Sequence, residues 1–141
     1  MNRLRLPAVM ESLEAFRSFL APELEQLGLP RERRWEIELV LEELLTNIIR
    51  YAYPRGPGEV EVSFFLEDQH RFCLSLRDWG RRFNLLEKGP PNLGPDLEQR
   101  SIGGLGIHLA RQLADEIDYH YESGVNQVTF CFDLTPPAAV S

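Results

Sequence analysis

The chain has 141 residues, a formal net charge of −7, 43% hydrophobic and 26% charged residues. This length and composition indicate one folded domain and exclude a largely disordered chain. No run of Lys and Arg forms a basic stripe, so we expect no nucleic acid partner. The N-terminus does not resemble a secretory signal, and no apolar stretch approaches the roughly 20 residues of a membrane span. We therefore expect a cytoplasmic protein without membrane contact.

The first half of the chain predicts a strand followed by helices. Residues 3–6 alternate as in a short strand, and an apolar residue recurs at helical spacing from Leu13. We expect Pro22 to open a second helical segment that ends at Gly28. The longest helical pattern covers roughly residues 31–52.

In the second half the apolar period changes to two, which predicts strands joined by hairpins. The alternating segments are 59–66, 71–78, 117–121 and 126–134. Residues 84–101 lack periodicity and suggest a mobile loop, and residues 104–115 are helical in pattern. The expected fold class is α+β. We predict a two-layer sandwich in which a mixed, mostly antiparallel sheet is covered by helices on one face.

The domain boundaries and the cysteines complete this outline. We expect a single domain over residues 1–135 and a disordered tail at 136–141. Cys73 and Cys131 each lie in a strand-like apolar run. They can pair only if the fold makes them neighbours, and we expect buried, reduced thiols instead.

Three polar motifs interrupt these patterns. Glu43 and Asn47 are one helical turn apart beside an apolar stripe. Asn is unfavourable inside a helix, which supports a functional role, and a solvated helix flank is the alternative. Asp78 ends a strand on its apolar side, where a carboxylate needs hydrogen-bond partners such as an adenine amino group; a simple Asp-x-Gly turn is the alternative.

The third motif is glycine-rich. Gly103, Gly104 and Gly106 precede a helical pattern and would let the backbone approach a phosphate at the helix N-terminus. A dinucleotide-binding turn requires a strand immediately before the glycines, whereas a Pro-containing loop precedes them here. A flexible hinge remains the alternative.

Together the three motifs resemble the GHKL ATPase superfamily, and most closely its bacterial anti-sigma factor serine kinases. The stretch EELLTNIIRYAYP resembles the N box of that family, RDWGRRFN its first glycine box, and GGLGIHLARQLADEIDYHY its second. The similarity extends over nearly the whole chain. It implies the histidine-kinase-like ATPase fold and ATP with Mg²⁺ as cofactors.

The resemblance also implies roles for individual residues. Asn47 would hold Mg²⁺, and Glu43 would be the general base that accepts the proton of a serine hydroxyl. Asp78 would bind the adenine amino group, and Gly80 would leave room for the ring. The remaining nucleotide-binding residues that the resemblance suggests are Arg100, Gly104, Gly106 and Thr129. Residues 84–103 would form a lid ordered by the γ-phosphate.

The function that follows is an ATP-dependent serine protein kinase that phosphorylates a small anti-sigma antagonist and sequesters a sigma factor. The resemblance also suggests a homodimer. The alternative is a non-catalytic module of the same fold in which ATP only gates partner binding. Glu43 favours the kinase, because a purely gating module needs no base.

Overall fold

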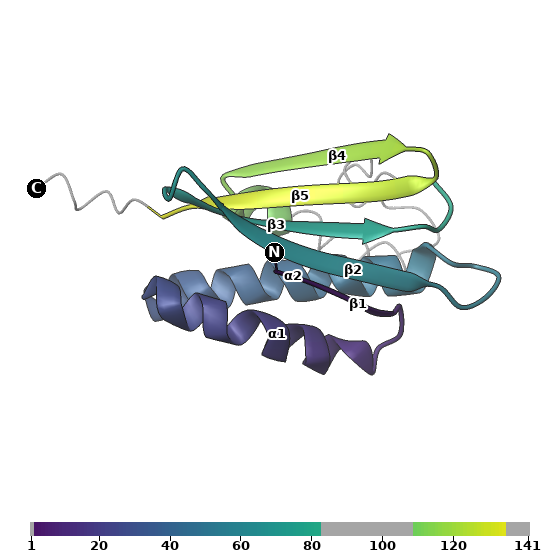
Figure 1. Cartoon of the computed structure of the whole chain (residues 1–141), viewed down its shortest axis with the longest axis horizontal. Helices are drawn as coiled ribbons and strands as arrows, with labels where there is room; N and C mark the ends of the chain where they lie inside the picture. The colour runs from purple at the N-terminus through teal and green to yellow at the C-terminus, as the bar shows by residue number, and fades with distance from the viewer. Residues whose placement is uncertain (1, 83–108, 135–141) are drawn as a thin grey trace, which may run out of the picture.

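The protein is a two-layer sandwich in which two long helices cover one face of a five-stranded sheet (Figure 1). Residues 109–113 are also helical, and Ala110 among them lies buried in the same core. The computed structural model describes residues 2–82 and 109–134. The elements are β1 (Asn2–Pro7), α1 (Ser12–Leu27), α2 (Arg31–Tyr51), β2 (Glu59–Glu67), β3 (Arg71–Asp78), β4 (Glu116–Glu122) and β5 (Val125–Asp133). The predicted α+β class and the covering of the sheet by helices are confirmed.

The strand order is β1-β2-β3-β5-β4, and all four pairings are antiparallel. The sequence predicted a mixed, mostly antiparallel sheet. Within the described part of the chain the sheet is entirely antiparallel, so the mixed character is corrected. Tight hairpins join β2 to β3 and β4 to β5, and such turns can only connect antiparallel neighbours. The crossover from β3 to β4 leaves β5 between these two strands.

The first helix does not break where the sequence predicted. Helix α1 runs through Pro22 without interruption and ends at Gly28, which is left-handed with φ 64°. The prediction of a new segment at Pro22 was wrong, whereas the helix end at Gly28 is confirmed. Pro22 lies on the exposed side, and the stripe of Phe16, Leu20 and Leu24 packs continuously on the core. Tertiary packing outweighs the hydrogen bond that proline cannot make.

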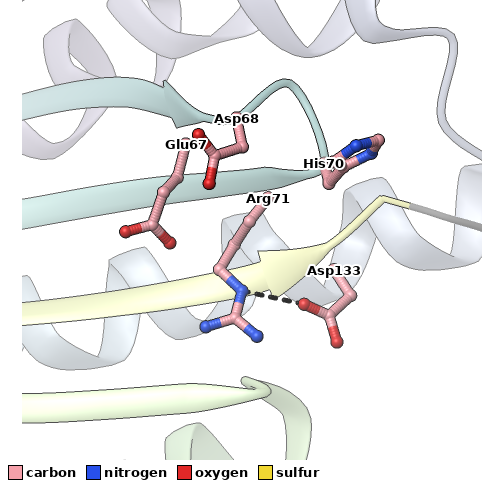
Figure 2. Close-up of a pocket in the computed structure, with 5 residues that line it drawn as sticks. All are labelled: Glu67, Asp68, His70, Arg71 and Asp133. Atoms are coloured by element: carbon pink, nitrogen blue, oxygen red, sulfur yellow. Dashed lines mark hydrogen bonds and ion pairs between the residues drawn. The ribbon is translucent and has the colours of Figure 1, made fainter.

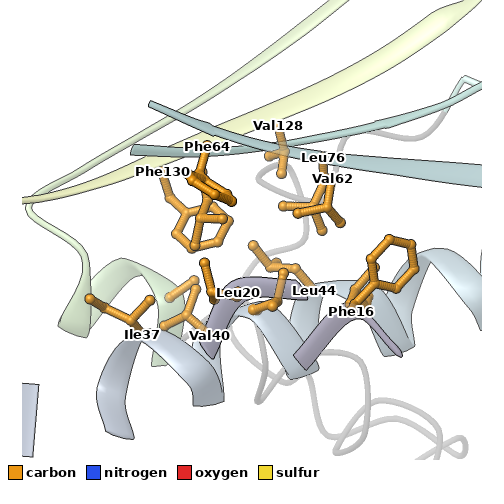
Figure 3. Close-up of a cluster of buried hydrophobic side chains, with 14 of the residues drawn as sticks. Phe16, Leu20, Ile37, Val40, Leu44, Val62, Phe64, Leu76, Val128 and Phe130 are labelled. Carbon is orange, nitrogen blue, oxygen red and sulfur yellow. The ribbon is translucent and has the colours of Figure 1, made fainter. Parts of the chain in front are cut away.

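The hydrophobic core lies between the helices and the sheet (Figure 3). It combines residues from α1 and α2 with strand residues that alternate toward the helices. The labelled members are Phe16, Leu20, Ile37, Val40, Leu44, Val62, Phe64, Leu76, Val128 and Phe130. No helix in residues 2–82 and 109–134 is both long and apolar enough to cross a bilayer.

The two cysteines form a disulfide across the sheet. Cys73 of β3 and Cys131 of β5 are register partners whose Cα atoms are 4.1 Å apart, and their sulfurs are bonded. The expectation of two reduced thiols was wrong, because it depended on the strands not being neighbours. The strand order brings them together, and the bond links β3 to β5 within the sheet.

Candidate functional site

Asp78 lies at the end of β3 on the side that faces the helices, and it is 4% exposed. One carboxylate oxygen, Oδ1, accepts hydrogen bonds from the Gly80 backbone N–H at 2.9 Å and from Asn126 Nδ2 at 3.0 Å. Burial raises the pKa of Asp78, and these two bonds oppose that shift by favouring the charged form. No described group donates to the second oxygen, Oδ2. That oxygen can accept a hydrogen bond from a ligand.

Asn126 is the site residue that the sequence analysis did not identify. It lies on β5 directly opposite Asp78 and is also 4% exposed. Its Nδ2 donates to the Arg81 carbonyl oxygen at 2.8 Å as well as to Asp78, and its Oδ1 accepts from the Tyr119 hydroxyl at 2.5 Å. The sequence signal that could have identified Asn126 is its polar side chain two positions before Val128, on the core side of β5.

Thr129 occupies the other face of the sheet from Asp78. It is the register partner of Ser75, and the two hydroxyl oxygens are 3.1 Å apart. Successive side chains of a strand point to opposite faces, so Thr129 and Asn126, three positions apart, lie on different sides. The structure does not bring Thr129 to the predicted site, and Asn126 stands beside Asp78 instead.

The end of α2 is fixed against the end of β3. The Arg81 backbone N–H donates to the Ala52 carbonyl oxygen at 3.0 Å. A Cβ added to Gly80 would lie 2.1 Å from that same oxygen, so only glycine permits this contact. The Trp79 backbone N–H donates to the Tyr53 hydroxyl at 2.8 Å. The absence of a side chain at Gly80 therefore serves the helix–strand junction; its predicted contact with a ring remains a prediction.

Asn47 is buried in the last turns of α2, five residues before Ala52 and thus about 7.5 Å along the helix axis. It is 3% exposed, and its Nδ2 donates to the backbone carbonyl of Glu43 at 2.9 Å. Its side-chain oxygen Oδ1 is buried and has no hydrogen-bond partner among the described residues. An unpaired buried carbonyl is costly, so this oxygen is suited to a ligand that supplies the missing interaction.

Glu43 lies one helical turn before Asn47 and is half-buried. Burial raises the pKa of its carboxyl group, the neighbouring Glu42 raises it further, and Arg50 lowers it. A carboxylate with a raised pKa accepts a proton more readily than an ordinary glutamate. The two residues of the motif thus place a basic group beside an unpaired oxygen.

This arrangement fits a magnesium ion that is shared with a bound phosphate. In residues 2–82 and 109–134, no three His, Cys, Asp or Glu side chains form a metal cluster. Magnesium in nucleotide sites commonly takes one or two protein oxygens and obtains the rest from phosphate and water. The unpaired Oδ1 of Asn47 is a hard oxygen ligand of that kind.

Three predicted site residues lie outside the described part of the chain. They are Arg100, Gly104 and Gly106. The predicted lid over residues 84–103 lies there as well. Their assignment stays a prediction.

A surface pocket of about 350 Å³ lies at the opposite end of β3 and is not part of this site (Figure 2). The hairpin turn beside it has two left-handed residues, Asp68 and Gln69, with φ of 53° and 59°. Arg71 at the start of β3 is paired with Asp133 at 2.9 Å. Strand geometry separates Arg71 from Asp78 by about 23 Å, so the pocket cannot share a small ligand with that carboxylate.

Comparisons with known proteins identify the family to which this fold belongs. Residues 6–132 match the family described as histidine kinase-like ATPase domain. The chain is 29% identical over 130 residues to the serine-protein kinase RsbW of Listeria monocytogenes, covering 89% of this chain and 82% of the relative. It is 25% identical over 126 residues to the RsbW of Bacillus mycoides, covering 86% and 78%.

Solved structures show the same fold. The RsbU and RsbW domains of a Mycobacterium tuberculosis protein superpose with a TM-score of 0.63 at 17% identity over 97% of this chain. The histidine kinase domain of a blue-light activated kinase from Erythrobacter litoralis gives a TM-score of 0.57 at 22% identity over 75% of this chain. The protein spans 34% and 46% of those two chains. With the family match over residues 6–132, these findings show that the chain belongs to the histidine kinase-like ATPase domain family.

Proposed function

We propose that this protein is an ATP-dependent serine protein kinase that phosphorylates a small anti-sigma antagonist protein and, in its free state, sequesters a sigma factor. Family membership implies ATP binding. The relatives with 25–29% identity are serine-protein kinases, which supports a serine as acceptor. The remaining support comes from the chemistry of α2.

The observation that carries this proposal is the pairing of Asn47 and Glu43. Asn47 presents a buried oxygen without a partner, and Glu43 presents a carboxylate of raised pKa one turn away. Asn47 would hold Mg²⁺, which when bound neutralises charge on the nucleotide phosphates. Asp78 would accept a hydrogen bond from the adenine amino group through its second oxygen.

Glu43 would act on the acceptor serine. Its carboxylate takes the proton of the serine hydroxyl as the serine oxygen attacks the γ-phosphorus of ATP. The bond from that phosphorus to the β,γ-bridging oxygen breaks, ADP leaves, and phosphoserine forms with the proton on Glu43. Phosphoryl transfer needs mainly positioning and charge stabilisation, so a single base on a rigid helix is sufficient.

Transfer of ³²P from ATP to a serine of the cognate antagonist tests this assignment. Glu43→Gln should lower the transfer rate about 10²–10⁴-fold, the usual effect of losing a general base, and leave ATP affinity nearly unchanged. Glu38→Gln is the matched control. It makes the same change on the same helix, where the side chain pairs with Arg34 at 3.5 Å and does not contribute to the pKa shift of Glu43. That variant should keep a rate close to the parental one.

Two results would contradict the kinase assignment in different ways. Parental transfer by Glu43→Gln would show that Glu43 is not the base. No transfer by a parent protein that binds Mg²⁺-ATP and a verified antagonist would favour the non-catalytic, ATP-gated binding module.

A further inference from the structure

A chain of hydrogen bonds runs across three strands to Asp78. The Tyr119 hydroxyl of β4 donates to Asn126 Oδ1 of β5 at 2.5 Å, and Asn126 Nδ2 donates to Asp78 Oδ1 of β3 at 3.0 Å. Tyr119 and Asn126 are diagonal neighbours in the register, since Tyr119 pairs with Val128. All three polar side chains are on the helix-facing side, where unpaired groups are costly.

The surroundings of Asn126 fix which way its amide points. Three acceptors surround Nδ2: the carboxylate of Asp78 at 3.0 Å and the backbone carbonyls of Arg81 at 2.8 Å and Gly80 at 3.5 Å. A flipped amide would place its own oxygen against these three oxygens. The donated hydrogen bond from Tyr119 to Oδ1 favours the observed orientation further.

This orientation determines which oxygen of Asp78 is left for a ligand. Oδ1 already accepts from Asn126 and from the Gly80 backbone N–H, whereas no described residue donates to Oδ2. The two bonds also fix the plane of the carboxylate. A donor group of a ligand must therefore approach Oδ2 along the lone-pair directions of this fixed plane.

We propose that Tyr119 and Asn126 are positioning residues that hold the Asp78 carboxylate in the orientation that selects adenine over guanine nucleotides. This inference rests on the proposed ATP site. Adenine offers an amino group at C6, which donates to a fixed carboxylate oxygen. Guanine offers a carbonyl oxygen at the same position, which repels it. A carboxylate that is free to rotate can also accept hydrogen bonds from other donors of the purine. Losing the fixed orientation of Asp78 therefore narrows the difference in affinity between adenine and guanine nucleotides.

The affinities of the full chain for Mg²⁺-ATP and Mg²⁺-GTP, measured by calorimetry, test this inference. Tyr119→Phe removes only the hydroxyl at the start of the hydrogen-bond chain, and Asn126→Ala removes its centre. Each variant should lower the ATP-to-GTP affinity ratio about 3- to 10-fold, the range expected when one neutral hydrogen bond is lost.

Tyr121→Phe is the matched control. Tyr121 lies on the same strand, is the register partner of Asn126 and contacts Arg82 through its ring. Within the described part of the chain its hydroxyl has no hydrogen bond to Asn126. The same loss of a hydroxyl should therefore leave the ATP-to-GTP ratio unchanged.

The ATP-to-GTP affinity ratio distinguishes a positioning role of Tyr119 and Asn126 from a merely structural one. A variant that only unfolds more easily binds both nucleotides less well and keeps their ratio. Unchanged ratios in Tyr119→Phe and Asn126→Ala, with a parent that prefers ATP, would overturn this inference and leave the proposed ATP site intact. A parent that binds neither nucleotide would overturn the ATP site itself, and the inference with it.

Discussion

Asp78 illustrates at the scale of one residue how a buried carboxyl group opposes stability. Its carboxyl group is buried, and burial raises its pKa because the charged form loses water. Two donors, from Gly80 and Asn126, compensate only in part. A fold optimised for stability alone would place an uncharged group here.

The variant Asp78→Asn should therefore bind ATP less well without becoming less stable at neutral pH. A carboxamide oxygen still accepts from Gly80 and Asn126, but its NH₂ group would face the adenine amino group. We expect a loss of roughly 1–3 kcal/mol in ATP binding, as for a charged hydrogen bond. Calorimetry with ATP and urea denaturation without it provide the two measurements. Equal ATP affinity in variant and parent would refute the adenine contact.

The pH dependence of stability follows from the same pKa. The folded pKa of Asp78 lies above its value in the unfolded chain, so the folded state holds a proton that the unfolded state releases. Stability contributed by this group is greatest below the unfolded pKa and decreases as the pH rises through the folded pKa. The stability advantage of Asp78→Asn should accordingly be present at neutral pH and disappear in acid. Urea denaturation of parent and variant across this pH range measures the difference.

Sequence reasoning predicted Asp78 and Asn47 from their polar character within apolar patterns. It selected Thr129 instead of Asn126, because the spacing typical of the family favours Thr129, whereas strand parity places that residue on the other face. The role of Gly80 at the junction could not be predicted. The sequence does not show that the Ala52 carbonyl oxygen comes within 2.1 Å of the point that a Cβ on residue 80 would occupy.

At the scale of elements, the site depends on how β3 and β5 are held together. Their register places Cys73 opposite Cys131 and Asp78 opposite Asn126. The disulfide and the polar pair therefore lie on the same two strands, five residues apart. Neither pairing is visible in the sequence, because β5 reaches β3 only through a long crossover connection.

Reduction of this disulfide should lower the free energy of unfolding by roughly 2–4 kcal/mol, since a cross-link over a separation of 58 residues restricts the unfolded chain. Urea denaturation with and without dithiothreitol measures the difference. The double variant Cys73→Ala/Cys131→Ala is the control, and reductant should not change its stability. The assignment of a stabilising disulfide would be contradicted if reductant left the parent midpoint unchanged.

Elements with strong periodicity were predicted well, and those governed by long-range packing were not. The strand at residues 71–78 and the helix from residue 31 follow directly from their apolar spacing. The helix break predicted at Pro22 does not occur, because the packing of α1 on the sheet overrules the local preference of proline.

At the scale of the whole molecule, the end of β3 contacts two segments distant in sequence, the end of α2 and the start of β5. The C-terminal half of α2 supplies Glu43 and Asn47, the end of β3 supplies Asp78, and β5 supplies Asn126. The contacts of Ala52 with Gly80 and Arg81 hold the helix against the strand. The fold thus fixes the helix that carries a basic carboxylate and an unpaired oxygen against the strand that carries a buried hydrogen-bond acceptor.

The metal dependence of ATP binding tests this arrangement most directly. Calorimetry with and without Mg²⁺ should show that the parent gains ATP affinity from the metal and that Asn47→Ala loses this gain.

The matched control is Thr46→Ala, on the same helix. Thr46 donates to the backbone carbonyl of Glu42 at 2.8 Å, as Asn47 donates to that of Glu43 at 2.9 Å. Thr46→Ala should keep the full gain in ATP affinity from Mg²⁺. Of the two residues, Asn47 is the one that presents an unpaired buried oxygen. An Asn47→Ala protein that still binds ATP more tightly with Mg²⁺, to the parental extent, would contradict the account.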